Sequence, residues 1–346
     1  MSDLSTRPLP GAQPGITGRQ IWLGIGAVLA LVLVWMIVAQ WPAWLNSILI
    51  SKRTFLTTLL NGLTLAGLYF LVASGFTLIF GLMRNVNLAH GSLYLLGAYI
   101  GYEVISRTGM WFLGVAVACL VLAVVGLVMQ VVVFRRLEGD DLRQTLVTIG
   151  ISIVAADLMI AVWGGNTYQI SSPDILSGPV TLPIVTLVRG DGNAVYLSYP
   201  LFRLSVLALA VAVGVALWLM INRTRLGMQI RAGVNDRAML SANGVNVHAV
   251  FAVVFAIGAG LAGLAGVIGG SALSVAPGED VRYLLASLVV VIVGGMGSVT
   301  GAAIGAVLIG VAEQMGLVYF PTYGAVITFV ILVVALAVRP QGIMGR

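Results

Sequence analysis

The stretch from Ala249 to Val275 reads AVFAVVFAIGAGLAGLAGVIGGSALSV and contains no charged residue. A helix needs about 20 predominantly apolar residues to cross the hydrocarbon core of a bilayer. This stretch is long enough, and its many glycine and alanine residues allow helix backbones to approach closely inside a membrane. It therefore predicts a transmembrane helix that is packed tightly among others.

The composition of the whole chain agrees with this prediction. Sixty per cent of the 346 residues are hydrophobic and 9% are charged, whereas a soluble domain has roughly 25% charged residues. The apolar runs are continuous and lack the polar alternation of an outer-membrane strand. The 43 glycines favour close helix packing. We expect an all-α fold, a polytopic transmembrane helical bundle with broken or short helices and an internal repeat.

Ten apolar segments are expected to build this bundle. They are Ile21–Trp41, Phe55–Met83, Ala89–Ile105, Trp111–Phe134, Leu142–Trp163, Leu201–Ile221, Ala249–Val275, Leu284–Met296, Val299–Leu317 and Tyr323–Val338. The eighth is short for a full crossing and the second is long and broken by glycine, so eight to ten crossings are expected. Residues 1–20 are rich in Pro, Gly, Ser and Thr, which predicts a disordered cytoplasmic N-terminus before one membrane domain over residues 21–338. The first segment ends in Gln-Trp-Pro, which favours a retained helix over a cleaved signal peptide.

The positive charges predict the orientation. If the chain begins inside and crosses ten times, twelve arginines lie inside and six Lys or Arg lie outside, in agreement with the positive-inside tendency. Residues 164–200 then form a periplasmic loop and residues 222–248 a cytoplasmic loop. The net charge of +6 is explained by these loops, so no nucleic-acid partner is expected.

Several kinds of site are poorly supported. The chain has one cysteine, Cys119, and two histidines, His90 and His248, which excludes an internal disulfide and argues against a metal site. It has no phosphate-binding loop of the form G-x-x-x-x-G-K-[ST], and neither H-E-x-x-H nor G-x-S-x-G. We therefore expect neither an enzyme nor a chain that uses ATP itself.

Two polar breaks interrupt the apolar segments and resemble each other. The first, Arg84–Ser92, reads RNVNLAHGS, and the second, Gly294–Gly301, reads GGMGSVTG. The first break follows a Gly-x-Met sequence at residues 81–83, and the second begins with one at residues 294–296. This similarity predicts a duplication with parallel repeats; the alternative is chance similarity between glycine-rich sequences. Polar groups at membrane depth must line a cavity or contact protein, so the breaks form either a solute path or gate, or plain turns at the cytoplasmic face. The candidate path residues are Asn85, Asn87, His90, Gly91, Ser92, Gly297, Ser298 and Gly301.

Two carboxylates fall within the predicted spans. Asp157 lies inside one segment and Glu313 lies nearer the end of another. A carboxylate in a bilayer is costly and is often functional. Each either binds a substrate ammonium group, pairs with an arginine or faces water.

The two long polar loops have local patterns of their own. The cytoplasmic stretch Asn222–His248 is basic, and Asn235 or Asp236 is placed to cap a short helix over Arg237–Ala242 that ends near Gly244. It is either a docking element for a partner or an ordinary basic loop. The outer loop predicts a hairpin of residues 180–187 and 194–199, which either contacts an external partner or is a passive cover.

Three separated motifs resemble one known family. The first motif consists of LNGLTLAGLY at residues 60–69 and NLAHG at residues 87–91. The second consists of TRLGM at residues 224–228 with the following Arg231, Asp236 and Gly244, and the third is GGMGSVTG at residues 294–301. Together they resemble the permease subunits of branched-chain amino-acid ABC importers, the Liv H type, over residues 55–340.

The resemblance implies a multi-pass permease of the bacterial inner membrane. It implies a complex with a second permease subunit in a heterodimer, two cytoplasmic ATPases that use the ATP, and a periplasmic solute-binding protein, with no cofactor on this chain. The solute is a branched-chain amino acid or a related small polar molecule such as urea, an amide or an aromatic acid. The alternative function is an ion-coupled secondary transporter. The implied ATPase-coupling residues are Arg225, Gly227, Arg231, Asp236, Gly244 and Asn246.

Overall fold

The computed structural model describes residues 51–83, 86–188, 194–321 and 324–345. The expected N-terminus 1–20 and the first expected helix, 21–41, lie outside the described residues. By the density of contacts the chain divides into two units, Met1–Leu56 with Pro183–Leu197, and Thr57–Leu182 with Ser198–Arg346. The larger unit contains every interaction discussed below, apart from the outer hairpin.

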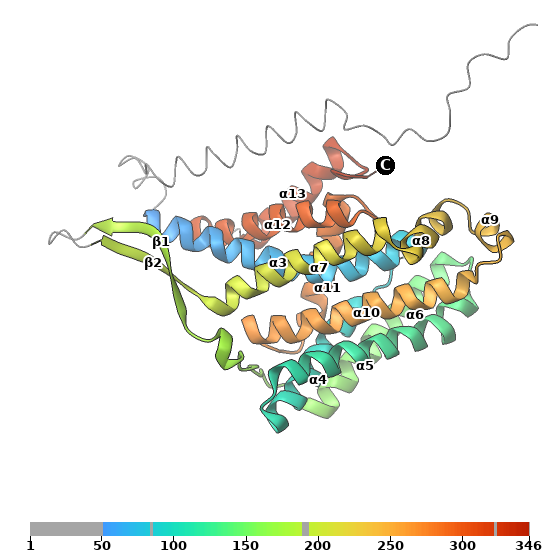
Figure 1. Cartoon of the computed structure of the whole chain (residues 1–346), viewed down its shortest axis with the longest axis horizontal. Coiled ribbons are helices and arrows are strands. Elements are labelled where there is room, and N and C mark those ends of the chain that lie inside the picture. The colour runs from blue at the N-terminus through green and yellow to red at the C-terminus, as the bar shows by residue number, and fades with distance from the viewer. Residues whose placement is uncertain (1–50, 84–85, 189–193, 322–323, 346) are drawn as a thin grey trace, which may run out of the picture. The chain divides into compact units, whose positions relative to one another are not determined.

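Helices dominate the described residues, as predicted (Figure 1). The α-helices are α3 (Lys52–Met83), α4 (His90–Thr108), α5 (Trp111–Val132), α6 (Asp141–Trp163), α7 (Leu201–Arg223), α8 (Arg225–Asn235), α9 (Arg237–Ala242), α10 (Val247–Ala272), α11 (Glu279–Gly294), α12 (Val299–Tyr319) and α13 (Gly324–Val338). Two short 3-10 helices are η1 (Phe134–Leu137) and η2 (Asp174–Leu176). Six of the described helices, α3, α5, α6, α7, α10 and α12, are long and apolar enough to cross a membrane by length and composition.

The predicted outer hairpin is confirmed. Strand β1 (Pro179–Val188) pairs with β2 (Ala194–Pro200) in a two-stranded sheet. No predicted strand end differs from the observed one by more than one residue. This close agreement is expected because the residues that determine a hairpin lie near each other in the sequence. The turn between the strands, residues 189–193, lies outside the described residues.

Glycines bring the helix backbones of the larger unit into contact, as the sequence of α10 predicts. A Cβ on Gly258 would lie 2.9 Å from the carbonyl oxygen of Gly75 on α3, and one on Gly97 of α4 would lie 2.5 Å from the Cα of Gly263. Helix α10 also packs along α5 (Figure 1). A side chain at these glycines would clash with the neighbouring helix, so the small residues of α10 allow three neighbours to approach it closely.

The helices α3–α6 and α10–α13 repeat one packing pattern in opposite directions. Helix α4 packs on α5, α6 and α10, and α11 packs on α12, α13 and α4. Helix α4 runs parallel to α10, since Gly97 meets Gly263 and Gly101 meets Val267.

Helices α3, α11 and α12 have the matching arrangement. Helix α11 runs parallel to α3, since Tyr283 lies 6.0 Å from Tyr69 between ring centroids and Gly297, just after α11, meets Gly81. Helix α12 runs antiparallel to α3, since Gly62 near the start of α3 meets Val311, while Gly81 near its end meets Gly297, just before α12. The repeat is therefore inverted, not parallel as the similarity of the two breaks predicts. By position, the partner of the break before α4 is the segment 273–278 before α11.

Candidate functional site

Helix α4 begins inside the bundle. Its first residue, His90, is completely buried, and its Nε2 lies 3.1 Å from the carbonyl oxygen of Val72. Val72 lies eleven residues before the end of α3 at Met83, a rise of about 16 Å along the helix. The chain therefore leaves α3 and returns into the interior before α4 starts. The first break is an interior segment, not a plain turn at the cytoplasmic face.

Hydrogen bonds from the break itself and from α6 hold this segment. The Oδ1 of Asn87 accepts from the backbone N–H of Ala89 at 3.1 Å, and the N–H of Leu88 donates to Thr148 Oγ1 on α6 at 3.2 Å. The hydroxyls of Ser92 and Ser152 lie 2.8 Å apart. Of the predicted path residues, Asn87, His90, Gly91 and Ser92 are thus buried together, and Asn85 lies outside the described residues.

Two polar atoms of the break have unused hydrogen-bonding capacity. Asn87 Nδ2 and His90 Nδ1 are buried and have no hydrogen-bond partner among the described residues. Burying a polar group without a partner costs free energy. Both atoms are therefore available to a polar molecule that reaches this part of the interior.

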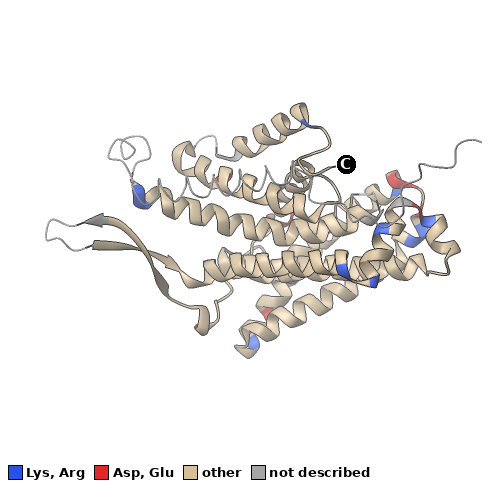
Figure 2. Ribbon diagram, turned by 45° about the horizontal axis from the view of Figure 1, so that its top comes forward, with Lys and Arg blue, Asp and Glu red and all other residues tan. Residues whose placement is uncertain are grey.

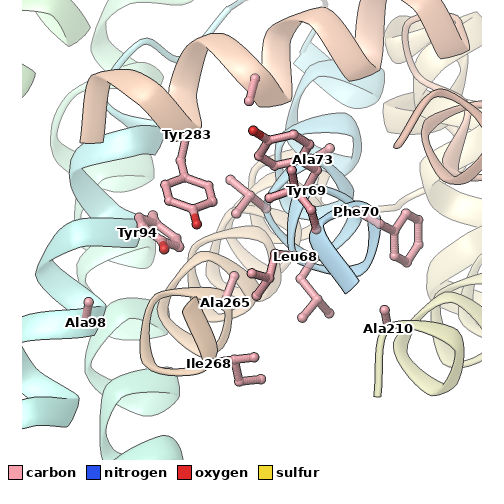
Figure 3. Packing of buried hydrophobic residues seen from close by; sticks show 14 of the residues in the cluster. Leu68, Tyr69, Phe70, Ala73, Tyr94, Ala98, Ala210, Ala265, Ile268 and Tyr283 are labelled. Carbon is pink, nitrogen blue, oxygen red and sulfur yellow. The ribbon is translucent and has the colours of Figure 1, made fainter. Parts of the chain in front are cut away.

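Helix α11 also begins inside the bundle, beside α4. A Cβ on Gly91 would overlap the carbonyl oxygen of Asp280 in the first turn of α11. The rings of Tyr94 and Tyr283 lie 4.2 Å apart between centroids, with Tyr69 of α3 next to Tyr283 (Figure 3). Two half-helices of opposite direction therefore start side by side, lined by three tyrosines.

A charged cluster joins the start of α11 to α12. Glu313 accepts a hydrogen bond from the Tyr69 hydroxyl at 2.8 Å, and its Oε1 lies 3.9 Å from Arg282 Nη2. Arg282 also lies 3.4 Å from Glu279. Of the three alternatives given for Glu313, the structure shows the pairing with an arginine, Arg282. Arg282 and the three tyrosines were not predicted as site residues; the only signal in the sequence was that Arg282 closely follows the Pro-Gly turn at residues 277–278.

The second break differs from the first. Ser298 Oγ accepts from the N–H of Gly301 at 3.0 Å and so caps α12, and Gly297 is exposed with φ +80°. Gly301 packs on the backbone of Gly294. The structure thus places Gly297, Ser298 and Gly301 in a helix-to-helix turn, which the last turn of α3 touches through Gly81.

Asp157 is separate from these groups. It lies on the exposed face of α6 with Ile153 and Ile160. The buried face of the same helix carries Gln144, Thr148 and Met159 instead.

The predicted coupling residues build a capped element of two short helices. Asp236 Oδ1 accepts from the N–H of Met239 at 2.9 Å and caps α9, whose bounds Arg237–Ala242 confirm the prediction. Gly244 has φ +79°, a conformation that favours glycine. Asn246 caps α10 by accepting from Ala249.

The other coupling residues hold α8 against the end of α7. Thr224 Oγ1 accepts from the N–H of Gly227 at 3.1 Å, and Arg231 donates to the carbonyl of Ile221. Arg225 is exposed in the first turn of α8. Figure 2 shows Lys and Arg gathered around this element.

A metal site finds no support in the part of the chain that the structure describes. No group of three or more His, Cys, Asp or Glu side chains there is placed to hold a metal ion. The polar groups above are amides, hydroxyls, an imidazole and paired charges, which suit weak contacts with a small polar molecule.

Comparison with known proteins identifies similar chains. The family described as "Branched-chain amino acid transport system / permease component" matches residues 58–336. The high-affinity branched-chain amino acid transport system permease protein BraD of Pseudomonas aeruginosa is 32% identical over 306 residues, which cover 84% of this chain and 96% of BraD. LivH of Escherichia coli K12 is 29% identical over 84% of this chain and 96% of its own. The ribose import permease protein RbsC of Haemophilus influenzae is 28% identical over 81% and 84%. No solved structure matches.

Proposed function

Because the chain belongs to the family of branched-chain amino acid transport system permease components, we propose that it carries a branched-chain amino acid or a related small polar solute through an ABC importer. It is a multi-pass protein of the inner membrane, with six described helices able to span it. Its proposed partners are a second permease subunit, two cytoplasmic ATPases and a periplasmic binding protein. ATP is used by the ATPases, and this chain needs no cofactor and performs no catalysis.

The observation that carries the proposal is the interior start of α4. Broken helices expose backbone and side-chain polar groups at membrane depth, which is where transporters place their solute sites. Here the unpaired Asn87 Nδ2 and His90 Nδ1 lie on such a break, next to the start of α11. We assign the solute path to this interior segment, with Ser92 as a further polar group on its wall.

The balance of polar and apolar groups agrees with transport. Around the break the wall is mostly apolar and aromatic, with Phe76 edge-on to His90 at 5.5 Å between ring centroids. A few neutral donors and acceptors hold a polar solute weakly, and weak contacts allow it to leave. The second break has no such buried, unpaired side chain among the described residues, and we assign it a structural role.

The proposed docking site for the ATPase is the element α8–α9. Its caps fix two short helices at one end of the membrane helices, and its basic residues Arg225 and Arg231 are exposed. The outer loop 164–200 is proposed to contact the binding protein.

Reconstituted vesicles test the function. The complete complex is placed in liposomes with ATP inside the compartment that the ATPases face, and uptake of labelled leucine is measured with the binding protein present. We expect uptake only with ATP and binding protein, and competition by isoleucine and valine. Competition by urea, short amides or aromatic acids instead would show that the transported solute belongs to one of those classes. Uptake driven by a proton or sodium gradient without ATP would support the ion-coupled alternative and overturn the proposal.

A further inference from the structure

Arg237, the first residue of α9, contacts three other parts of the larger unit. Its Nη2 donates to the carbonyl oxygen of Met83 at 3.2 Å, and its Nη1 lies 3.5 Å from Glu138 Oε1. Its guanidinium carbon lies 4.8 Å from the ring centroid of Phe251 on α10. One side chain of the proposed docking element thus reaches α3, the α5–α6 connection and α10.

The contact with Met83 is at the base of the interior break. Met83 is the last residue of α3, and the last carbonyls of a helix have no N–H partner within the helix. A cation is also favoured at a helix C-terminus. Arg237 supplies both the donor and the charge at the last carbonyl of α3.

The contact with Glu138 adds a second anchor. The Oε2 of Glu138 lies 3.7 Å from Nδ1 of His248, in the first turn of α10. The carboxylate therefore lies between the start of α9, at Arg237, and the start of α10, at His248. The side chains of Arg237 and Glu138 are 39% and 38% exposed, and a pair that exposed contributes little to folding stability.

A cavity beside the guanidinium leaves room for movement. Its volume is about 440 Å³, and its lining includes Met83, Phe134, Glu138, Arg237 and Phe251. Because α9 begins at Arg237 and is fixed by the cap of Asp236, a displacement of α9 displaces this side chain directly. The cavity lies beside the side chain that such a displacement would move.

We propose that Arg237 is a positioning residue that links the docking element α8–α9 to the interior break through the end of α3. It transmits a movement of α9, caused by an ATPase, to the end of α3 and from there to the break that contains Asn87 and His90. The inference rests on the proposed function, and it goes beyond it by naming the side chain that connects the ATPase site to the solute path.

The test is the ratio of solute taken up to ATP hydrolysed, in liposomes that hold the complete complex. We expect Arg237→Gln to lower this ratio about tenfold, within the range usual for coupling between two sites. Arg143→Gln is the matched control, because Arg143 lies near the same loop, pairs with Asp140 and is 74% exposed. A wild-type ratio in Arg237→Gln would overturn the inference. Loss of ATP dependence in the wild-type complex would instead overturn the proposed function.

Two further measurements separate coupling from structure. Where Arg237→Gln fails to assemble, Glu138→Gln removes the ion pair that orients the Arg237 guanidinium at the end of α3, and a wild-type ratio there overturns the inference. In a Cys119→Ser background, a cysteine at Val86 reports on the break itself. We expect ATP to change its rate of thiol labelling in the wild type and not in Arg237→Gln. An equal, ATP-dependent change in both would show that the movement reaches the break by another route.

Discussion

Gly91 of α4 and Asp280 of α11 meet with no space for a side chain between them. A Cβ at position 91 would overlap the carbonyl oxygen of Asp280 and would lie 2.8 Å from the Cβ of Leu284. The two residues belong to the first turns of the two half-helices. Their contact therefore fixes how the interior ends of α4 and α11 lie against each other.

Gly91→Ala is expected to force these ends apart. Overpacking of this kind costs about 1–3 kcal/mol, and because the displaced helix carries Ser92 and follows Asn87, we expect uptake to fall with it. Thermal unfolding and solute uptake measure the two effects. Gly150→Ala is the control, because nothing lies within 4 Å of a Cβ at that helical position. Equal behaviour of the two variants would contradict the assigned path.

Arg282→Gln is expected to lower the thermal stability of the protein. The substitution leaves the carboxylate of Glu313, 13% exposed, without its positive partner. Since Arg282 itself is 47% exposed, solvent screening limits the cost to about 1 kcal/mol. The double variant Arg282→Gln with Glu313→Gln should be more stable than Arg282→Gln alone. A double-mutant cycle without any coupling would show that the pair does not interact.

Removal of the C-terminal tail is expected to destabilise the turn between α11 and α12. The N–H groups of Ile343 and Met344 donate to the carbonyls of Val293 and Gly294, each at 2.9 Å. Truncation after Gln341 leaves both carbonyls unpaired, at a cost of about 1–3 kcal/mol in total. Denaturant unfolding in detergent measures it, and removal of Arg346 alone is the control. Full stability after truncation would mean that water replaces both bonds.

Cysteine labelling tests the orientation. In a Cys119→Ser background, a cysteine at the exposed Ser177 of the outer loop should react with a membrane-impermeant thiol reagent in intact spheroplasts. A cysteine at the exposed Ser241 of α9 should react only after lysis. The positive-inside distribution of arginine is the physical reason. The opposite pattern would reverse the topology and move the docking site to the outside.

Features that nearby residues determine were predictable from the sequence. Asp236, three residues before the N–H that it caps, located α9 to the residue, and the hairpin followed from the two runs that flank the glycine-rich sequence at residues 189–193. The short eighth segment was also recognised, although its helix begins at Glu279 and not at Leu284. In each case the interaction spans only a few positions of the chain.

The depth of His90 was not predictable in this way. Where α4 starts relative to the bundle depends on Val72, Thr148 and Gly258, which are distant in the sequence. The similarity of the two Gly-x-Met breaks is local, whereas the repeat lies in the packing of eight helices. The pairing of Arg282 with Glu313, 31 positions later, likewise follows from the fold.

The crossing of α3 and α10 at Gly75 and Gly258 has a mechanical consequence. Helices usually interlock, because ridges of side chains on one fit grooves on the other, and a shift along the axis must lift one ridge over the next. Here the ridge on each helix is interrupted by a glycine, so that backbone faces backbone, and the nearest side chain at Gly258 is Ile79. A shift of α3 along α10 at this point has a lower steric barrier than at an interlocked crossing, because the side chain that must move is Ile79 and not a whole ridge.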